Sequence, residues 1–470
     1  MIQQNGQPLL LVAAVLIYLI AFAMVWFLGF IYALPFLWVL PLIGYYLLQS
    51  VIKPILLLIP MLGATYLGDV VRVIPDGTIP LTLFQIFLFL GIAVFFLHYL
   101  LKNEEKFRIL GIELELLLIF TLMSFSIFYS PNRESALLNL SRMFFLIIMV
   151  YLIINILRER KHFFTVFTVL TAIATLLGVL SVQAALLDPV TAIMNIRAGG
   201  TRIFGRGAIT VHDPNVFATL FFLPIAFTTS IFFSRMSYHW RAPAFVVTLI
   251  LLAGLASTYS RSAWIATAFL LLMLVVYYRQ YKMVSLVLIT VLVVFISIPE
   301  LRNMSVGFFN RILDIFSGAT DDSSRIRLLL GIAAIHMFFD SWMMGVGFRG
   351  FPETFTNYFN TRESIGVVEP HNVIYELLAE LGIIGFGLFL FLAIIIFKKA
   401  SHNVHYSQTE LDKVIATTLI SSLIAFFIFF QFYGGALVNT NLWGLIGLIF
   451  AQGYYVSYKN TRSKILAFDQ

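Results

Sequence analysis

Two arginines and a glycine-rich segment precede the predicted start of a helix. Arg202 and Arg206 stand on either side of Gly205, and the sequence Asp-Pro-Asn ending at Asn215 follows a few residues later. A glycine lets the backbone approach a ligand closely, and aspartate followed by proline is typical of a helix start. Helix N-termini attract anions, and arginine binds phosphate or carboxylate through two hydrogen bonds. We therefore expect Arg202, Arg206 and Asn215 to bind an anionic ligand; the alternative is an ordinary loop that caps a helix.

A lone arginine lies in a short polar turn between two apolar segments. The turn is Ser257–Ser262, and Arg261 is its one charged residue. A charged side chain this close to the hydrocarbon of a membrane is costly and usually has a function. Arg261 is therefore a candidate site residue, and the alternative is a side chain that only extends to the membrane surface.

A histidine stands in the first residues of another apolar segment. Glu369 and Pro370 precede His371, and Asn372 follows it. Proline suits the first turn of a helix, so we expect His371 at a helix N-terminus, where the helix dipole disfavours the imidazolium and lowers its pKa. Since a neutral imidazole accepts a proton near pH 7, His371 is the candidate general base. The alternatives are a histidine that only forms a hydrogen bond, and Glu369 as the base.

The sequence predicts neither a metal site nor a cofactor. No two histidines have the spacing of a zinc-protease motif, and no group of carboxylates resembles a metal cage. The chain has no cysteine, which excludes thiol catalysis, thiolate metal ligands and disulfides.

Long apolar segments must position these residues. Hydrophobic residues make up 60% of the 470 residues and charged residues 11%, whereas a soluble domain has roughly 45–50% and 25%. At roughly 20 residues for each membrane-spanning helix, we predict an all-α, polytopic integral membrane protein with about 12–14 transmembrane helices. This composition excludes a soluble enzyme and a disordered chain, and the unbroken apolar segments exclude the alternating strands of a β-barrel. No basic segment precedes the first apolar stretch, so a cleaved signal peptide is not expected. The expected spans are 9–28, 30–48, 51–68, 82–101, 111–129, 137–157, 163–187, 214–234, 242–258, 263–278, 283–299, 371–397, 414–433 and 442–458.

The basic residues divide between the two membrane surfaces by type. In this arrangement all ten lysines lie on one side with both termini, and the positive-inside rule identifies that side as the cytoplasm. The thirteen basic residues of the other side are all arginines, so we expect that surface to bind a phosphorylated ligand. The alternative is contact with lipid headgroups, and the net charge of +7 is not taken as a sign of nucleic-acid binding. The arginines are Arg72, Arg133, Arg142, Arg197, Arg202, Arg206, Arg261, Arg302, Arg311, Arg325, Arg327, Arg349 and Arg362.

Three regions follow from the spans and loops. Residues 1–190 are expected to form N-terminal transmembrane helices. Residues 191–400 form the core and include a large extracytoplasmic loop, 300–370. Residues 401–470 form C-terminal transmembrane helices and a cytoplasmic tail.

The large loop is expected to contain one amphipathic helix on the outer leaflet. This helix covers 325–344, where four ionisable residues, among them Arg325 and Asp340, make a transmembrane span improbable. The glycine-rich segment Gly345–Phe351 that follows is expected to be a flexible turn that can carry a gate.

Five short motifs occur in a fixed order along residues 195–400. They are Arg-x-x-Gly at Arg202, Asp-Pro-Asn-x-x-Ala at Asp213, Ser-Arg-Ser at Ser260, an arginine-led helix that starts at Arg325 and ends in Gly-x-Gly at Gly347, and His-Asn with Glu-x-Gly-x-x-Gly over residues 371–385. Each motif alone is weak. As an ordered set they resemble the O-antigen ligase and polymerase superfamily, and they do not separate its members. The first 190 residues match only as generic spans.

This resemblance implies a multi-pass glycosyltransferase of the bacterial inner membrane, with its active site on the periplasmic face. The donor would be a glycan on undecaprenyl pyrophosphate. A ligase passes it to the lipid A core, whereas a polymerase passes it to a second lipid-linked glycan. The lipid bilayer is the remaining partner, and no nucleic acid is expected.

The same resemblance assigns roles to residues. His371 starts the His-x10-Gly pattern and would be the base of an inverting displacement. Arg261 and Arg206 would stabilise the leaving pyrophosphate without a metal ion. The expected substrate-binding residues are Arg202, Asn215, Arg325, Asn372 and Glu380.

Two other classes of function remain open at this point. A flippase or other transporter would place its cations along a cavity at mid-membrane depth, where only Arg142 is a candidate. The other class is a non-catalytic membrane scaffold, for which the predominance of arginine on the outer surface would be accidental.

Overall fold

The computed structural model describes residues 42, 44–67, 82–101, 106–187, 213–282, 322–359 and 369–468. In these ranges the chain is helical without a β-strand, and eight helices are long and apolar enough to cross a membrane, or nine if one bent pair forms a span. The all-α polytopic fold is thus confirmed. Two expected spans, 9–28 and 283–299, and most of a third, 30–48, lie outside the described residues.

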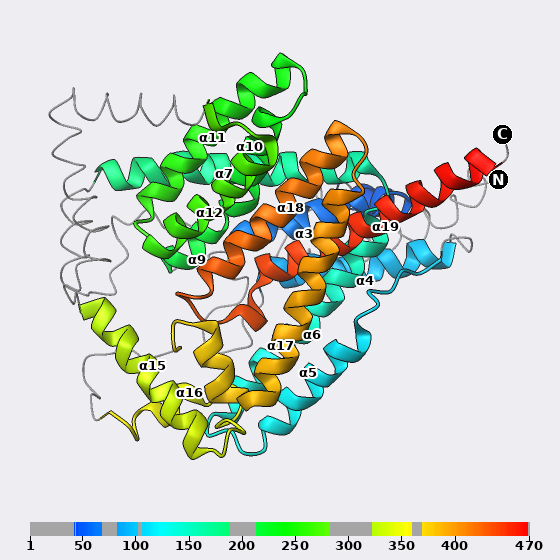
Figure 1. The fold of residues 1–470 in the computed structure, drawn as a ribbon. Helices are drawn as coiled ribbons and strands as arrows, with labels where there is room; N and C mark the ends of the chain where they lie inside the picture. Colours follow the sequence, from blue (N-terminus) through cyan, green and yellow to red (C-terminus); the bar gives the residue numbers. More distant parts are fainter. Residues whose placement is uncertain are drawn as a thin grey trace, which may run out of the picture. The chain divides into compact units, whose positions relative to one another are not determined.

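The described helices coincide with the remaining expected spans (Figure 1). The helix α5 has 14 residues and falls short of the expected 111–129. The helices are α3 (Ile55–Leu67), α4 (Leu83–Leu101), α5 (Glu113–Ser126), α6 (Arg133–Ile156), α7 (Arg160–Leu187), α9 (Pro214–Thr219), α10 (Phe222–Phe233), α11 (Tyr238–Ser257), α12 (Arg261–Tyr278), α15 (Asp322–Asp340), α16 (Phe351–Phe355), α17 (Val373–His405), α18 (Glu410–Phe429) and α19 (Thr440–Phe468), with a 3-10 turn η2 (Ala436–Val438) before α19.

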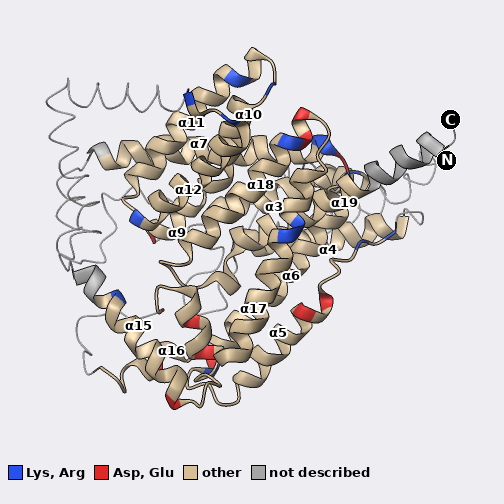
Figure 2. Cartoon of the chain, viewed as in Figure 1, with Lys and Arg blue, Asp and Glu red and all other residues tan. Residues whose placement is uncertain are grey.

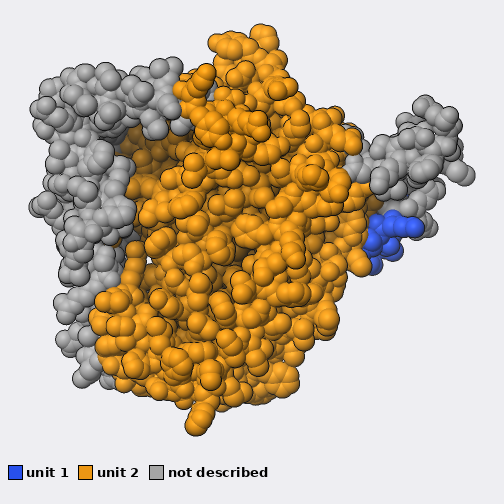
Figure 3. Space-filling model, viewed as in Figure 1, with its two compact units in different colours: residues 1–64, 71–107 blue, residues 65–70, 108–470 orange. Residues whose placement is uncertain are grey.

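The chain divides into two compact units (Figure 3). The first consists of residues 1–64 and 71–107. Within it, the helical segment Gly44–Ile52 meets α3 at an angle of 112°. Pro54 lies at this bend. Proline lacks the backbone N–H that a continuous helix needs, so the helix is interrupted there.

The second unit, residues 65–70 and 108–470, contains every candidate site residue that is described. Its most buried span consists of α9 and α10, Pro214–Phe233. The α10 sequence is apolar on all sides, which is typical of a helix enclosed by other helices. It packs against α7, α11, α12 and α18.

The helix α15 lies outside this bundle and packs on α16 and α17. Leu330, Ala333 and Met337 on one face of α15 are buried against Phe351 and its neighbours. The opposite face is also apolar and exposed at Leu328, Ile335 and Phe339. As expected, the helix is not one of the eight candidate spans. Its bounds, Asp322–Asp340, and its second apolar face differ from the amphipathic helix expected over 325–344.

The segment Gly345–Phe351 differs from the flexible turn expected from its sequence. Phe348 is buried, its N–H donates to Ser126 Oγ (3.0 Å), and its carbonyl accepts from Ser130 Oγ (2.9 Å). Val346 N–H donates to the Ala379 carbonyl (2.8 Å). The expectation was wrong because the glycines here allow close packing against α5 and α17 instead of mobility.

The helix α17 begins later than expected and contains a sharp bend. Pro370 and His371 precede it, since His371 has a left-handed backbone (φ +54°) and Asn372 is the N-cap. The bend is at Gly382, where φ is +67° and ψ is −163°. Figure 1 shows the short segment before this glycine and the long segment after it running in different directions.

Figure 2 shows the distribution of the charged residues over the second unit. Basic residues lie over the α10–α11 turn, and acidic residues lie around α16 and the start of α17. Acidic residues also lie beside lysines, as in the pairs Lys161–Glu159 and Lys413–Glu410, and the topology remains a prediction.

Candidate active site

The start of α9 forms one side of the candidate site. Asp213 is the N-cap of α9, and its Oδ1 accepts a hydrogen bond from the Asn215 N–H (2.7 Å), as expected for an Asp-Pro-Asn helix start. Asn215 Oδ1 in turn accepts from the buried Ser260 hydroxyl (2.8 Å). Ser260 directly precedes Arg261, the first residue of α12. Two motifs 45 residues apart in sequence are therefore joined by one side-chain hydrogen bond.

Tyr433, which was not among the predicted site residues, links His371 to the start of α9. Tyr433 donates its hydroxyl to Asp213 Oδ2 (2.7 Å). The Tyr433 ring lies 5.8 Å from the His371 ring, between centroids. The Nδ1 atom of His371 is buried and has no hydrogen-bond partner among the described residues. A buried polar atom without a partner is unusual in a folded protein, so Nδ1 has a hydrogen-bonding capacity that the described residues do not use.

The surroundings of His371 favour its neutral form. Burial lowers the pKa of His371 below the ordinary value, and the positive charge of Arg327 lowers it further. Glu369 and Asp213 act in the opposite direction without reversing the shift. The shift of the His371 pKa has the expected direction. Its main cause is burial, whereas the expectation was based on the helix dipole. Arg327 lies in the first turns of α15, which brings that helix to the site.

A buried arginine and three carboxylates support the start of α17. Arg349 Nη1 donates to Glu369 Oε1 (2.9 Å) and lies 3.8 Å from Glu376 Oε1. Its own N–H donates to Glu380 Oε2 (2.8 Å). The side chains of Arg349 and Glu369 are only 11% and 17% exposed, so little water screens this pair. The arginine thus ties the segment before His371 to the loop after α15.

The α18–α19 connection closes the site from the other side. Asn372 Nδ2 donates to the Gln431 carbonyl (2.8 Å), and Asn372 Oδ1 caps α17 by accepting from Ile374 N–H (2.8 Å). Glu376 Oε2 accepts from the Gly435 N–H (2.7 Å). Tyr433 therefore lies beside His371, between Gln431 and Gly435, which both form hydrogen bonds with the first residues of α17.

The predicted residues are only partly brought together. Asn215, Arg261, His371 and Asn372 belong to segments that meet here. Arg202 and Arg206 lie outside the described residues, as does the side chain of Arg325.

Glu380 has a position that differs from that of an open ligand site. It is 3% exposed, and its two carboxylate oxygens face the N–H groups of Arg349 (2.8 Å) and Phe351 (3.4 Å). Its contacts are therefore with the loop that carries Arg349. Its assignment as a substrate-binding residue remains a prediction.

Sequence reasoning missed Tyr433, Arg349 and Arg327 as members of the site. Arg349 and Arg327 were in the set of outward arginines, but nothing in their spacing separated them from the other eleven. Tyr433 precedes Gly434-Gly435 in an apolar segment, and only its contact with Asp213 distinguishes it. Within the described ranges, no three His, Asp or Glu side chains are placed to share a metal ion.

Comparison with known families agrees with these motifs. Residues 246–390 match the family model described as O-antigen ligase. The matched region runs from α11 to the long segment of α17 and includes Arg261, Arg327, Arg349 and His371. No curated protein matches the chain. Over residues 246–390 the match supports the resemblance predicted from the motifs, so this part of the chain is similar to the O-antigen ligase family.

Proposed function

We propose that this membrane protein transfers a glycan from undecaprenyl pyrophosphate to an acceptor hydroxyl. The transfer takes place on the periplasmic face of the bacterial inner membrane, and the acceptor is the lipid A core. The observation that carries this proposal is the buried, unpartnered Nδ1 of His371, in a segment matched by the O-antigen ligase family.

The proposed reaction is a single displacement at the anomeric carbon. The acceptor oxygen forms a bond to this carbon while the carbon–oxygen bond to the pyrophosphate breaks. His371 takes the hydroxyl proton, for which a neutral imidazole is needed. Lowering of the His371 pKa by burial and by Arg327 supports this role. Undecaprenyl pyrophosphate leaves with the electron pair of the broken bond and the sugar configuration is inverted.

The arginines stabilise the negative charge that develops on the leaving pyrophosphate. Arg261 directly follows Ser260, whose hydroxyl donates to Asn215 at the α9 start. A helix N-terminus and a guanidinium act together on such a charge. Arg327 supplies a second positive charge beside His371.

The remaining residues position these groups. Asp213 and Tyr433 hold the α9 start against the His371 ring, and Arg349 fixes the backbone before His371 through Glu369. Tyr433 also offers an aromatic face near the site, as sugar-binding sites commonly do.

Surface glycolipid from a deletion strain tests the proposed acceptor, when the lipid-linked intermediates are extracted beside it. We expect a bare lipid A core and long polymer accumulated on undecaprenyl pyrophosphate. A core that carries a single repeat without a ladder would instead identify a polymerase. Normal patterns in both fractions would exclude the protein from this pathway.

A further inference from the structure

A concave groove runs along the part of α17 that is farthest from His371. Its volume is about 670 Å³, and α17 lines it together with Phe427 of α18. Residues 383–405 of α17 extend about 35 Å at a rise of 1.5 Å per residue, and a bilayer core is about 30 Å thick. The groove therefore reaches the membrane surface opposite the bend at Gly382.

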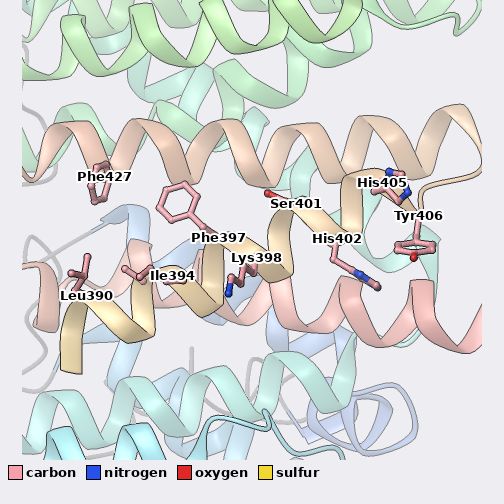
Figure 4. Close-up of a pocket in the computed structure, with 10 residues that line it drawn as sticks. Leu390, Ile394, Phe397, Lys398, Ser401, His402, His405, Tyr406 and Phe427 are labelled. Carbon is pink, nitrogen blue, oxygen red and sulfur yellow. The ribbon is translucent and has the colours of Figure 1, made fainter. Parts of the chain in front are cut away.

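The lining of this groove changes from apolar to basic along one stripe of α17. Leu390 and Ile394 form the apolar part. Lys398, His402 and Tyr406 continue the stripe at the same spacing of four residues, which keeps them on one helix face. Figure 4 shows the apolar side chains at one end of the groove and the histidines and Tyr406 at the other.

The lysine in this stripe differs from others at the same end of the bundle. Lys161 is paired with Glu159 at 2.7 Å, and Lys413 lies at the start of α18 with an acidic partner at 2.9 Å. Among the described residues, no acidic side chain forms an ion pair with Lys398. A cation without an internal counter-ion, next to imidazole and hydroxyl groups that donate hydrogen bonds, is suited to an external anion.

We propose that this groove binds an anionic phospholipid of the cytoplasmic leaflet. The phosphate lies against Lys398 and His402, and an acyl chain follows Leu390 and Ile394 toward Phe427. Basic pockets between transmembrane helices on the cytoplasmic side recognise acidic lipid headgroups in this way. The apolar part favours a lipid over a free phosphate ion. The lysine distribution assigns this end of α17 to the cytoplasm.

The apolar wall of the groove borders a small cavity of about 60 Å³, which is too small to hold an acyl chain. Ala393, Phe397 and Phe427 also line this apolar cavity between α17, α18 and α19. Its walls include Leu392 and Trp443 and contain Gln431 as a polar residue. The lipid site is separate from the glycan-transfer site and does not depend on it.

Native mass spectrometry of the full chain tests the headgroup contact, with phosphatidylglycerol and phosphatidylcholine as the two probes. We expect phosphatidylglycerol to bind more tightly than phosphatidylcholine. Lys398→Gln should weaken phosphatidylglycerol binding by about fivefold, the worth of one basic residue near an anionic membrane surface. Lys161→Gln is the matched control, because it removes one charge at the same end of the bundle but outside the groove. It should bind as the wild type does.

A second pair of variants tests the apolar part and does not rely on charge. Ile394 lines the groove and is 42% exposed, whereas Phe391 is 52% exposed and does not line it. Ile394→Trp should fill the groove and reduce phosphatidylglycerol binding, and Phe391→Trp should leave it unchanged. Equal binding of the two lipids, or full binding by Lys398→Gln, overturns the proposal. A dimer that Ile394→Trp converts to a monomer, with lipid binding unchanged, would show that a second copy covers the groove.

Discussion

At the residue scale, the protonation of His371 controls the proposed reaction. Burial and Arg327 lower the pKa of His371, so its neutral form persists to a lower pH than for a free histidine. We expect kcat/KM to fall on the acidic side with a midpoint below pH 6.5, the ordinary histidine pKa. Arg327→Gln removes a positive charge, raises the His371 pKa and should move this midpoint to higher pH. A pH profile of glycan transfer measures both.

Glu369 provides the control for this prediction, since its charge acts in the opposite direction. Glu369→Gln should lower the His371 pKa and move the acidic midpoint to lower pH. If Arg327→Gln and Glu369→Gln shift the profile in the same direction, the titrating group is not His371.

Arg349 makes a second prediction at this scale. Its guanidinium is paired with Glu369 at 2.9 Å and is 11% exposed. Removing one partner of a buried ion pair leaves the others uncompensated, which costs about 3 kcal/mol or more. Arg349→Met should therefore clearly lower the melting temperature in detergent.

Arg133→Met is the matched control for Arg349. Arg133 is exposed, and its Nη2 donates to the carbonyl of Phe128 (2.9 Å). Its loss should leave the melting temperature nearly unchanged. Equal melting temperatures of the two variants would mean that the ion pairs of Arg349 do not stabilise the protein.

At the scale of elements, the bend in α17 allows this helix to pack closely against the turn after α15, where the Ile383 N–H donates to the Met343 carbonyl (3.0 Å). At Gly382 a Cβ atom would lie 2.2 Å from the Met343 carbonyl oxygen, and the backbone angles there are restricted to glycine. Gly382→Ala should destabilise the protein by about 2 kcal/mol or more and reduce activity, measured by melting temperature and glycan transfer. Gly387→Ala on the same helix meets nothing within 4 Å and should be neutral or stabilising. Loss of activity in both variants would show that the bend has no special role.

The same helix shows what the sequence can and cannot predict. Apolar segments long enough to cross a membrane predicted α17 and α18 well, because hydrophobic length alone determines a span. The Asp-Pro-Asn start of α9 was equally predictable from its capping chemistry. The left-handed backbone at His371 and the pairing of Tyr433 with Asp213 depend on contacts between segments 220 residues apart. No local pattern encodes such contacts.

At the scale of the whole molecule, opposite ends of the bundle must face opposite sides of the membrane if His371 acts on the periplasmic face. The chain has no cysteine, so single cysteines can be introduced and labelled without a background. Trp342 is 87% exposed after α15 and Tyr238 is 78% exposed at the start of α11. In spheroplasts, an impermeant maleimide should label Trp342→Cys at once and Tyr238→Cys only after lysis. The reverse order would invert the topology and place His371 on the cytoplasmic side.

In the proposed reaction, His371 takes the proton of the acceptor hydroxyl during glycan transfer from undecaprenyl pyrophosphate. The most direct measurement is the release of undecaprenyl pyrophosphate by the purified chain in proteoliposomes, with lipid-linked glycan as donor and lipid A core as acceptor. We predict that His371→Ala binds the donor but loses at least about a hundredfold in rate, as expected for loss of a general base. His336→Ala, on α15, is the control and should retain the wild-type rate. A His371→Ala variant with wild-type turnover would contradict the account.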